Sequence, residues 1–281
     1  MIHLTNKNQQ ITNINKINKI KEINEKIKKH RENSKLLNDY NKLNGYFKLK
    51  TSYNSIIPLK LFTSWHTKDL PPLMKQNYDK LKTDNPEFEH YLFDENDCKT
   101  FIKNNFDEEV FNAYNHLLPC AYKSDLWRYC VLYINGGIYV DIKFKCSNGF
   151  KFISLTEREF FVKDIRPKYI YNALIVTLPK NNKLLNAINQ IVLNVKNKYY
   201  GENPLFPTGP ALLGNYFNEK DFNNFSLYHK FTVIKNVLEE YYIIYNDNII
   251  VRSYKDYRKE QSENQKNEHY DKLWHLNKIY V

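Results

Sequence analysis

The chain has 281 residues, which is long enough for one large α/β domain with a substantial hydrophobic core. Aromatic residues make up 15% of it, so it has ample apolar surface to bury, and this excludes a chain that is disordered throughout. The net charge is +11, but outside the N-terminal segment the lysines are scattered rather than arranged in a stripe. We therefore expect a solvated basic surface that attracts anionic substrates, and no nucleic-acid partner.

The N-terminal residues 1–50 differ from the rest of the chain. Isoleucines recur there every three or four residues among Lys, Asn and Glu, at positions Ile11, Ile14, Ile17, Ile20, Ile23 and Ile27. This spacing predicts a basic helical extension with a narrow isoleucine stripe. The helix would pack against the remaining domain, 51–281, or mediate self-association. A membrane-surface helix is a weaker alternative, because the Trp or Phe anchors typical of such helices are missing.

From about Pro58 onward, short apolar runs alternate with helical patterns, which indicates an α/β fold with a mostly parallel sheet flanked by helices. The predicted strands are 59–65, 88–93, 138–140, 160–163, 174–177, 241–245 and 249–251. The predicted helices outside the central segment are 73–83, 94–104 and 184–198, the second opened by the acidic cap Asp94.

The segment 121–145, AYKSDLWRYCVLYINGGIYVDIKFK, carries the densest pattern of polar residues. Asp125 and Arg128 are three residues apart within an apolar helical run, which places both on one helix face. Gly136 and Gly137 then end the helix, because glycine adopts left-handed conformations without steric cost. A short strand follows and ends at Asp141. Because ligands bind at the carboxyl ends of strands in α/β sheets, we expect a binding site here.

This segment also carries a family resemblance. The pattern SDLWRY, then NGG, then IYVD resembles the DXD-containing nucleotide-sugar glycosyltransferases, in particular glycosyltransferase family 32 with its initiating mannosyltransferases and capsular sugar transferases. Similar segments follow the family's order: KLFTSWHTKDLPP at 60–72, PTGPALLG at 207–214 and HYDKLW at 269–274. The resemblance implies a GT-A-like fold. It also implies transfer of a hexose from a UDP- or GDP-sugar to a glycan or glycoprotein acceptor, with retention of anomeric configuration.

In this family the D-x-D motif binds Mn²⁺ or Mg²⁺, which bridges the two phosphates of the donor. Asp141 matches the first acid, but Lys143 occupies the position of the second, and a lysine cannot replace that metal ligand. In one alternative, Asp141 and His269 hold the metal together. In another, Lys143 with Lys145 supplies positive charge without a metal. Since residues 141, 143 and 145 of a strand point to one face, Asp141 and Lys143 would also be able to form a plain ion pair.

Other residues take candidate roles from the resemblance. Asp125 resembles the acid that hydrogen-bonds the donor sugar, and Arg128 resembles the arginine that grips sugar or phosphate. With Asp141, they are the predicted catalytic residues, although Asp125 and Arg128 would also be able to pair structurally. Tyr139 resembles a tyrosine that lines the sugar site, and the alternation along the strand equally allows a core position.

Three further residues are candidates for contact with the donor. Trp65 resembles the tryptophan that stacks on the nucleotide base, and its alternative is a core position at the strand end. Gly209 lies in a TGP loop that would approach the ligand closely or form an ordinary turn. Trp274 would close over the diphosphate or pack the C-terminus.

Other function classes have no support in the sequence. It has no nucleophile elbow, P-loop or G-x-G-x-x-G pattern, so hydrolase, kinase and Rossmann dehydrogenase functions are not indicated. The alternative function is a non-catalytic module that binds glycan or nucleotide and has lost the second motif acid.

Cysteine usage and hydropathy bear on the cellular compartment. Cys98, Cys120, Cys130 and Cys146 form no C-x-x-C pair, which favours reduced, buried thiols. No apolar run approaches the ~20 residues that cross a bilayer. The first residues, MIHLTNKNQQ, lack the apolar core of a signal peptide. We therefore expect a cytoplasmic location and no transmembrane segment.

Overall fold

The structure of the protein is a computed structural model that describes residues 2–234 and 237–281, with side chains described from residue 21 onward except at 23, 235 and 236. The chain divides into two compact units. One consists of Met1–Asn44 with Thr232–Glu239, and the other of Gly45–Phe231 with Glu240–Val281.

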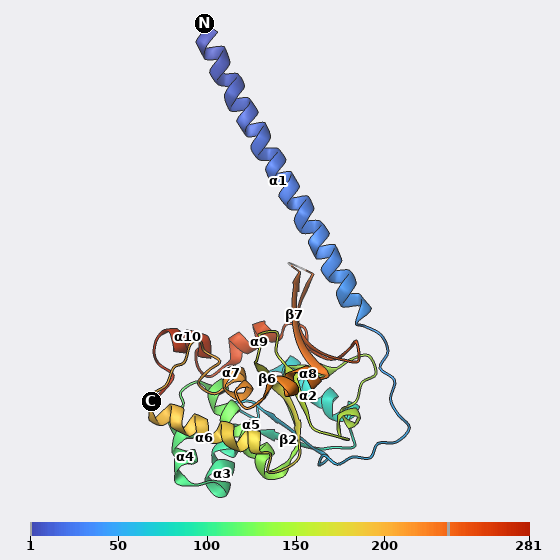
Figure 1. Ribbon diagram of the computed structural model, residues 1–281, viewed down its shortest axis with the longest axis vertical. Helices are drawn as coiled ribbons and strands as arrows, with labels where there is room; N and C mark the ends of the chain where they lie inside the picture. Colours follow the sequence, from blue (N-terminus) through green and yellow to red (C-terminus); the bar gives the residue numbers. More distant parts are fainter. Residues whose placement is uncertain (1, 235–236) are drawn as a thin grey trace. The chain divides into compact units, whose positions relative to one another are not determined.

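The first unit contains the long helix α1 (Ile2–Lys42), where the sequence predicts a helix (Figure 1). The predicted isoleucine stripe lies mostly outside the described side chains. Ile27 is described and is 45% exposed. Packing or self-association through residues 1–50, and the domain boundary at residue 50, stay predictions. In the described part of the chain, no helix combines the length and the apolar character that spanning a membrane requires.

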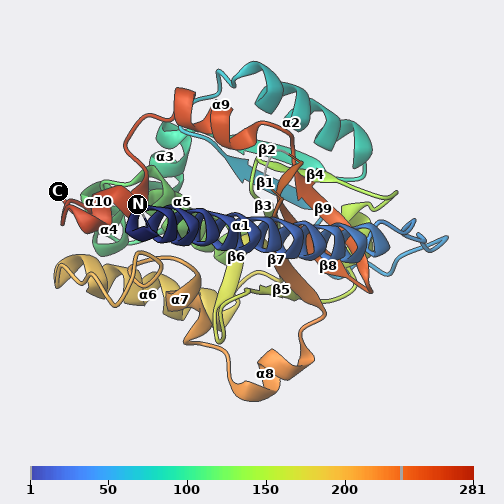
Figure 2. The same ribbon diagram turned by 90° about the horizontal axis from the view of Figure 1, so that it is seen from above.

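The larger unit is built on one curled sheet of nine strands among the described residues, in the order β2-β1-β3-β6-β5-β7-β8-β9-β4 (Figure 2). In chain order the strands are β1 (Lys60–Ser64), β2 (Glu89–Phe93), β3 (Gly137–Val140), β4 (Phe144–Cys146), β5 (Phe160–Lys163), β6 (Ile170–Thr177), β7 (Leu227–Ile234), β8 (Leu238–Tyr245) and β9 (Asn248–Ser253).

Helices and one 3₁₀ turn, η1, connect these strands. They are α2 (Pro72–Asp84), α3 (Glu95–Asn105), α4 (Glu108–His116), α5 (Cys120–Asn135), η1 (Phe152–Leu155), α6 (Asn182–Lys196), α7 (Pro210–Gly214), α8 (Glu219–Asn224), α9 (Tyr257–Asn264) and α10 (Tyr270–His275). The predicted α/β class is confirmed. The four cysteines are free thiols, as predicted, and Cys98 and Cys130 are fully buried.

The sheet is mixed. β1 pairs in parallel with β2 and β3, and β5 pairs in parallel with β7. β6 runs antiparallel to β3 and β5, and β9 runs antiparallel to β4 and β8. The mostly parallel pairing expected from the alternation of strands and helices is found at the β2-β1-β3 end. Elsewhere, short connections join β5 to β6 and β8 to β9, and such connections permit only antiparallel pairing.

Each face of the sheet packs against different helices. In β3, Tyr139 faces a core that it shares with α3, α4, α5 and α6, and these helices lie beside one another in Figure 1. Ile138 and Val140 face the opposite core, which contains Tyr78 and Leu81 of α2. In Figure 2, α2 and α6 accordingly lie on opposite sides of the strands. This alternation brings the side chain of Tyr139 against α5, the helix that carries Asp125 and Arg128.

The α5–β3 junction forms as the sequence predicts. The amide of Gly136 donates to the carbonyl of Leu132 and ends α5, and φ is +63° at Gly136 and +101° at Gly137. A side chain at Gly137 would place its Cβ 2.6 Å from the carbonyl oxygen of Lys60 in β1. Glycine therefore permits both the turn and the close pairing of β1 with β3, which fixes where β3 begins.

Candidate active site

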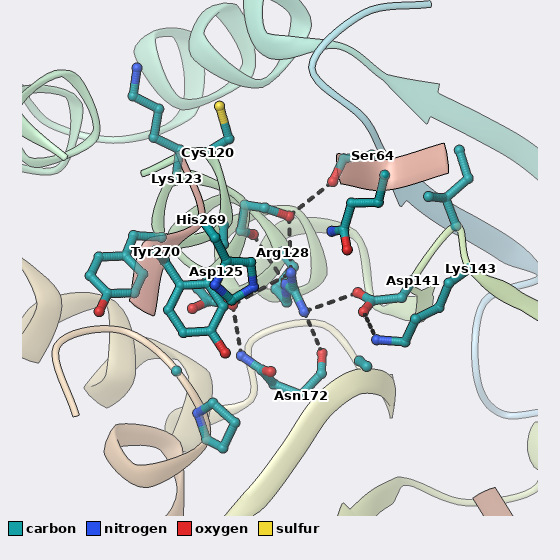
Figure 3. A pocket seen from close by; sticks show the side chains of 18 of the residues that line it. Ser64, Cys120, Lys123, Asp125, Arg128, Asp141, Lys143, Asn172, His269 and Tyr270 are labelled. Atoms are coloured by element: carbon teal, nitrogen blue, oxygen red, sulfur yellow. Dashed lines mark hydrogen bonds and ion pairs between the residues drawn. The ribbon is translucent and has the colours of Figure 1, made fainter. Parts of the chain in front are cut away.

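A cavity of about 480 Å³ opens at the carboxyl ends of the parallel strands β1 and β3. Its walls come from the end of β1, the first half of α5, the turn after β3, the start of β6, the loop before α7, strand β7 and the C-terminal segment. Figure 3 shows that Asp125, Arg128, Asp141, Lys143 and Asn172 lie close together on this wall. The polar cluster that the sequence places after β3 therefore lines a cavity.

Arg128 is at the centre of the cluster, and its side chain is only 7% exposed. Its Nε donates to the carbonyl oxygen of Ser124, and Nη2 donates to the Ser124 hydroxyl at 3.0 Å. Nη1 donates to the carbonyl of Asn172 at 2.8 Å and to Oδ1 of Asp141 at 3.3 Å, and Nη2 lies 3.4 Å from Oδ1 of Asp125. A guanidinium has five donors, and Arg128 makes four hydrogen bonds to protein groups, while Nη2 also lies at ion-pair distance from Asp125. Arg128 therefore positions the two carboxylates, and its role in gripping sugar or phosphate stays a prediction.

Asp125 is a buried carboxylate held by two neutral donors besides Arg128. Asn172 donates to Oδ1 at 2.9 Å, and the hydroxyl of Thr208 donates to Oδ2 at 2.7 Å. Burial raises the pKa of Asp125 above its usual range, and the attraction of Arg128 and the two hydrogen bonds offset this rise only in part. Each carboxylate oxygen has two lone-pair sites, so the carboxylate retains acceptor capacity toward the cavity.

Asp141 is the second carboxylate of the cluster, and it is partly buried. Its Oδ1 accepts from the Tyr139 hydroxyl at 2.7 Å as well as from Arg128, and its Oδ2 accepts from the ammonium of Lys143 at 2.6 Å. Burial opposes ionisation, but Lys143 first and then Arg128 outweigh it, so the pKa of Asp141 is lowered. Asp141 is therefore ionised at neutral pH.

The chain after β3 turns instead of continuing as a strand. The amide of Phe144 donates to the carbonyl of Asp141 at 3.0 Å, and β4 starts at Phe144. The expectation that residues 141, 143 and 145 share one strand face is therefore wrong. The turn brings Lys143 back onto Asp141. Lys145 instead lies in β4, opposite Arg252 in the antiparallel register with β9, and does not line the cavity.

The residues around Asp141 do not fit a divalent metal ion. Both of its oxygens accept from protein donors, and a lysine ammonium lies 2.6 Å away, where a second ligand would be needed. His269 lines the cavity, and its Nδ1 accepts from the amide of Asp271 at 3.3 Å, as the cap of α10, so Nε2 is the nitrogen of this ring that would face a ligand. Within residues 2–234 and 237–281, no group of three or more His, Cys, Asp or Glu side chains is placed to hold a metal. Hence nothing described completes the predicted metal site of Asp141 and His269.

Of the three aromatic residues predicted to contact the donor, two line the cavity and one does not. Tyr139 is buried, its hydroxyl supports Asp141, and its ring lies 4.3 Å from the Arg128 guanidinium, so it is a core residue that also forms the base of the site. Trp65 lines the cavity, and its indole N–H has no hydrogen-bond partner among the described residues. Trp274 does not line the cavity, because its indole donates to the carbonyl of Tyr200 and the ring packs against the helical core.

Gly209 lies directly over Asp125. A Cβ added at this glycine would be 3.4 Å from Oδ2 of Asp125, and φ at Gly209 is −97°. A Cβ at this distance would make ordinary van der Waals contact, so neither space nor backbone conformation demands glycine here, but the absence of a Cβ leaves room beside the carboxylate.

Sequence reasoning missed Asn172, which hydrogen-bonds Asp125, Tyr129 and Arg128. The signal was a polar residue in an apolar run, but the predicted strand began at residue 174, two residues too late. Sequence reasoning also missed the opposite wall of the cavity. There the rings of Tyr171 and His229 stack at 3.5 Å, and Nδ1 of His229 lies 3.3 Å from Asp164. No sequence motif marks Tyr171 or His229.

Comparison with protein families identifies the class of this site. Residues 71–160 match the model of the glycosyltransferase sugar-binding region containing the DXD motif. This range includes Asp125, Arg128, Asp141 and Lys143. Residues 71–160 are therefore similar to the sugar-binding region of DXD-type glycosyltransferases, and the resemblance seen in the sequence is confirmed.

Individual relatives agree with this class. The chain is 30% identical over 80 residues to an uncharacterized glycosyltransferase of Acanthamoeba polyphaga mimivirus, covering 28% of this chain and 32% of the relative. It is 23% identical over 165 residues to the mannosyl phosphorylinositol ceramide synthase SUR1 of Saccharomyces cerevisiae, covering 56% and 41%. It is 32% identical over 60 residues to the initiation-specific alpha-1,6-mannosyltransferase of Candida albicans, covering 21% and 16%.

The matched segments thus span less than half the length of each of these relatives. Among solved structures, the PaToxG glycosyltransferase is similar with a TM-score of 0.44 and 17% sequence identity, over 68% of this chain and 79% of that one.

Proposed function

We propose that the protein is a glycosyltransferase that transfers a hexose from a UDP- or GDP-sugar to a glycan or glycoprotein acceptor, with retention of anomeric configuration. The observation that carries the proposal is the buried Asp125–Arg128–Asp141 cluster on the cavity wall, inside the range that matches the sugar-binding family model. The names of the yeast and Candida relatives, both of which refer to mannose, support mannose as the transferred sugar.

The chemistry of the proposed reaction is suited to such a wall. Transfer breaks the bond between the anomeric carbon and a diphosphate oxygen, and the departing diphosphate takes both bonding electrons. In a retaining front-face reaction, that oxygen also accepts the proton of the attacking acceptor hydroxyl. Catalysis then depends on holding the sugar in place and on stabilising the leaving charge.

In this proposal Asp125 accepts hydrogen bonds from hydroxyl groups of the donor sugar. Its carboxylate is fixed by Asn172, Thr208 and Arg128, and Gly209 leaves the space beside Oδ2 open. Since Arg128 forms ion pairs with both carboxylates, this residue acts by orienting Asp125 and Asp141. A prearranged acceptor of this kind binds sugar without reorganisation at the moment of reaction.

The proposal is tested by incubating the purified protein with GDP-mannose, UDP-glucose and UDP-galactose, and measuring release of GDP or UDP by chromatography. Slow hydrolysis of one donor is expected even without acceptor. Asp125→Asn should lower the rate about 100-fold, because the sugar is no longer held in its reactive orientation. Asp79→Asn on the exposed face of α2 is the matched control and should leave the rate unchanged. If no nucleotide sugar is bound or hydrolysed with or without Mn²⁺, the proposal is wrong.

One observation favours the alternative function, a non-catalytic module that binds glycan or nucleotide. The Lys143–Asp141 ion pair replaces the pair of acids that the DXD motif names. This alternative predicts saturable binding of a nucleotide sugar without turnover. The same assay distinguishes the two functions.

The cytoplasmic location stays a prediction.

A further inference from the structure

Lys143 is a fixed cation on the cavity wall. Its side chain is 11% exposed, and its ammonium lies 2.6 Å from Oδ2 of Asp141. The ammonium also lies within cation–π distance of two aromatic rings, 5.4 Å from that of Tyr171 and 5.6 Å from that of Tyr241. These contacts restrict a side chain that is otherwise flexible, and they hold its charge beside the cavity.

Arg258 is a second cation on the same part of the wall. Its Nη2 donates to the Tyr241 hydroxyl at 2.6 Å, its Nη1 donates to Gln261, and its guanidinium carbon lies 4.8 Å from the Tyr241 ring. Within the part of the chain that the structure describes, no carboxylate lies within ion-pair distance of Arg258. Its charge is therefore not neutralised by the protein.

Lys143 and Arg258 thus converge on one ring, that of Tyr241, from different segments of the chain. The acid on this part of the wall, Asp164, faces His229 at 3.3 Å. Arg258 presents planar donors that match phosphate oxygens, and Lys143 presents a compact positive charge. Two such groups at one ring form a site for an anion with several oxygens.

We propose that Lys143 and Arg258 bind the diphosphate of the donor directly, so that the protein holds its nucleotide sugar without a divalent metal ion. This inference rests on the proposed function. In a DXD site, two carboxylates hold a metal ion, and the metal ion neutralises the charge of the diphosphate. Here the second carboxylate is exchanged for an ammonium that balances Asp141, so the positive charge of Arg258 is left to compensate the diphosphate.

The first test needs no variant. The full chain is titrated with GDP, UDP and GDP-mannose by isothermal calorimetry, once with EDTA and once with Mn²⁺. We expect one of these ligands to bind with the same Kd, within about twofold, under both conditions. Binding that appears only with Mn²⁺ would overturn the inference and leave the proposed function standing. Absence of binding under both conditions would instead refute the proposed function.

The second test uses substitutions. Lys143→Met and Arg258→Met each remove one charged hydrogen-bond donor and should weaken binding of the same nucleotide about 10- to 100-fold in EDTA. Lys145→Met is the matched control, because this neighbouring lysine does not line the cavity, and it should bind as the wild type does. Circular dichroism verifies that each variant is folded. Wild-type affinity in folded Lys143→Met and Arg258→Met proteins would contradict the inference.

Discussion

Replacing Arg128 by methionine tests whether this residue is the structural centre of the site. The substitution keeps an apolar stem of similar length but removes all five donors. It leaves Asp125 with two neutral donors and no cation, while Asp141 retains Lys143. The buried carboxylate of Asp125, left without a cation, is then the main source of the expected loss of stability.

The magnitude follows from this burial. Removing one partner of a buried ion pair typically costs about 3–5 kcal/mol, because the remaining charge stays desolvated without compensation. We expect Arg128→Met to lower the free energy of unfolding by that amount at pH 7. In an Asp125→Asn background, Arg128→Met should cost at least about 1 kcal/mol less, because no uncompensated charge remains at position 125.

The sign of the pH dependence provides a second readout. The pKa of Asp125 is raised by burial in the wild type, and loss of Arg128 raises it further. A carboxyl whose pKa is higher in the folded than in the unfolded state binds protons on folding, so stability increases as the pH falls. The deficit of Arg128→Met should therefore shrink between pH 7 and pH ~4.

Urea unfolding followed by tryptophan fluorescence measures both effects. Arg158→Met is the control, since Arg158 is exposed and has no carboxylate partner among the described residues, and it should change stability by less than about 0.5 kcal/mol. A loss below about 1 kcal/mol in Arg128→Met, or a deficit that grows on acidification, would show that Asp125 does not depend on Arg128.

Three further outcomes follow from the same geometry. Gly137→Ala should destabilise the fold by about 2–3 kcal/mol in urea unfolding, because φ is +101° there and the new methyl would lie 2.6 Å from the Lys60 carbonyl oxygen; a loss under about 0.5 kcal/mol would contradict the close β1–β3 contact. Asp141→Asn should lose about 1–3 kcal/mol at pH 7. Burial opposes ionisation of Asp141, but ion pairing holds its pKa below 3.8. The deficit of Asp141→Asn should therefore disappear as the pH falls below 3.8. A pH-independent deficit would contradict the assigned ionisation. Gly209→Ala should leave stability within about 0.5 kcal/mol but raise KM for the donor about tenfold, because its methyl group would take up space beside Oδ2 of Asp125 that the proposed sugar uses; an unchanged KM would place the sugar elsewhere.

Local signals in the sequence were sufficient for many elements of the fold. The strand predicted at 160–163 is β5 residue for residue, and Asp94 caps α3 through a hydrogen bond to the amide of Asp97. Both features depend on side chains within a few residues of each other, namely an apolar β-branched and aromatic run and an acidic cap. The α5–turn–β3 segment is also determined by neighbouring residues, because two glycines at positive φ end the helix.

The parts of the site that were missed depend on pairing between distant segments. Asn172 reaches Asp125 only because β6 lies antiparallel beside β3, and His229 reaches Tyr171 from β7, a strand that pairs with β5. Arg258 enters the cavity from α9, far along the chain. No pattern within one segment specifies which distant strand will be its neighbour, so these contacts could not be read from periodicity or spacing.

The conformation after β3 explains why a lysine is compatible with this position. In a continuing strand, residues 141 and 143 would stand side by side on one face, and two carboxylates there would share a cation. The turn closed by the Phe144 amide instead directs the Lys143 ammonium onto Asp141, so the lysine itself occupies the space beside that carboxylate. A change to aspartate at this position would remove the cation that balances Asp141 and add a second carboxylate near it, and like charges in a partly buried site are unfavourable without a counter-ion. We therefore expect Lys143→Asp to fold with lower stability than the wild type in EDTA and to recover stability when Mn²⁺ is added, measured as the melting temperature. A Lys143→Asp protein as stable as the wild type in EDTA would show that the positive charge at this position is not what balances Asp141.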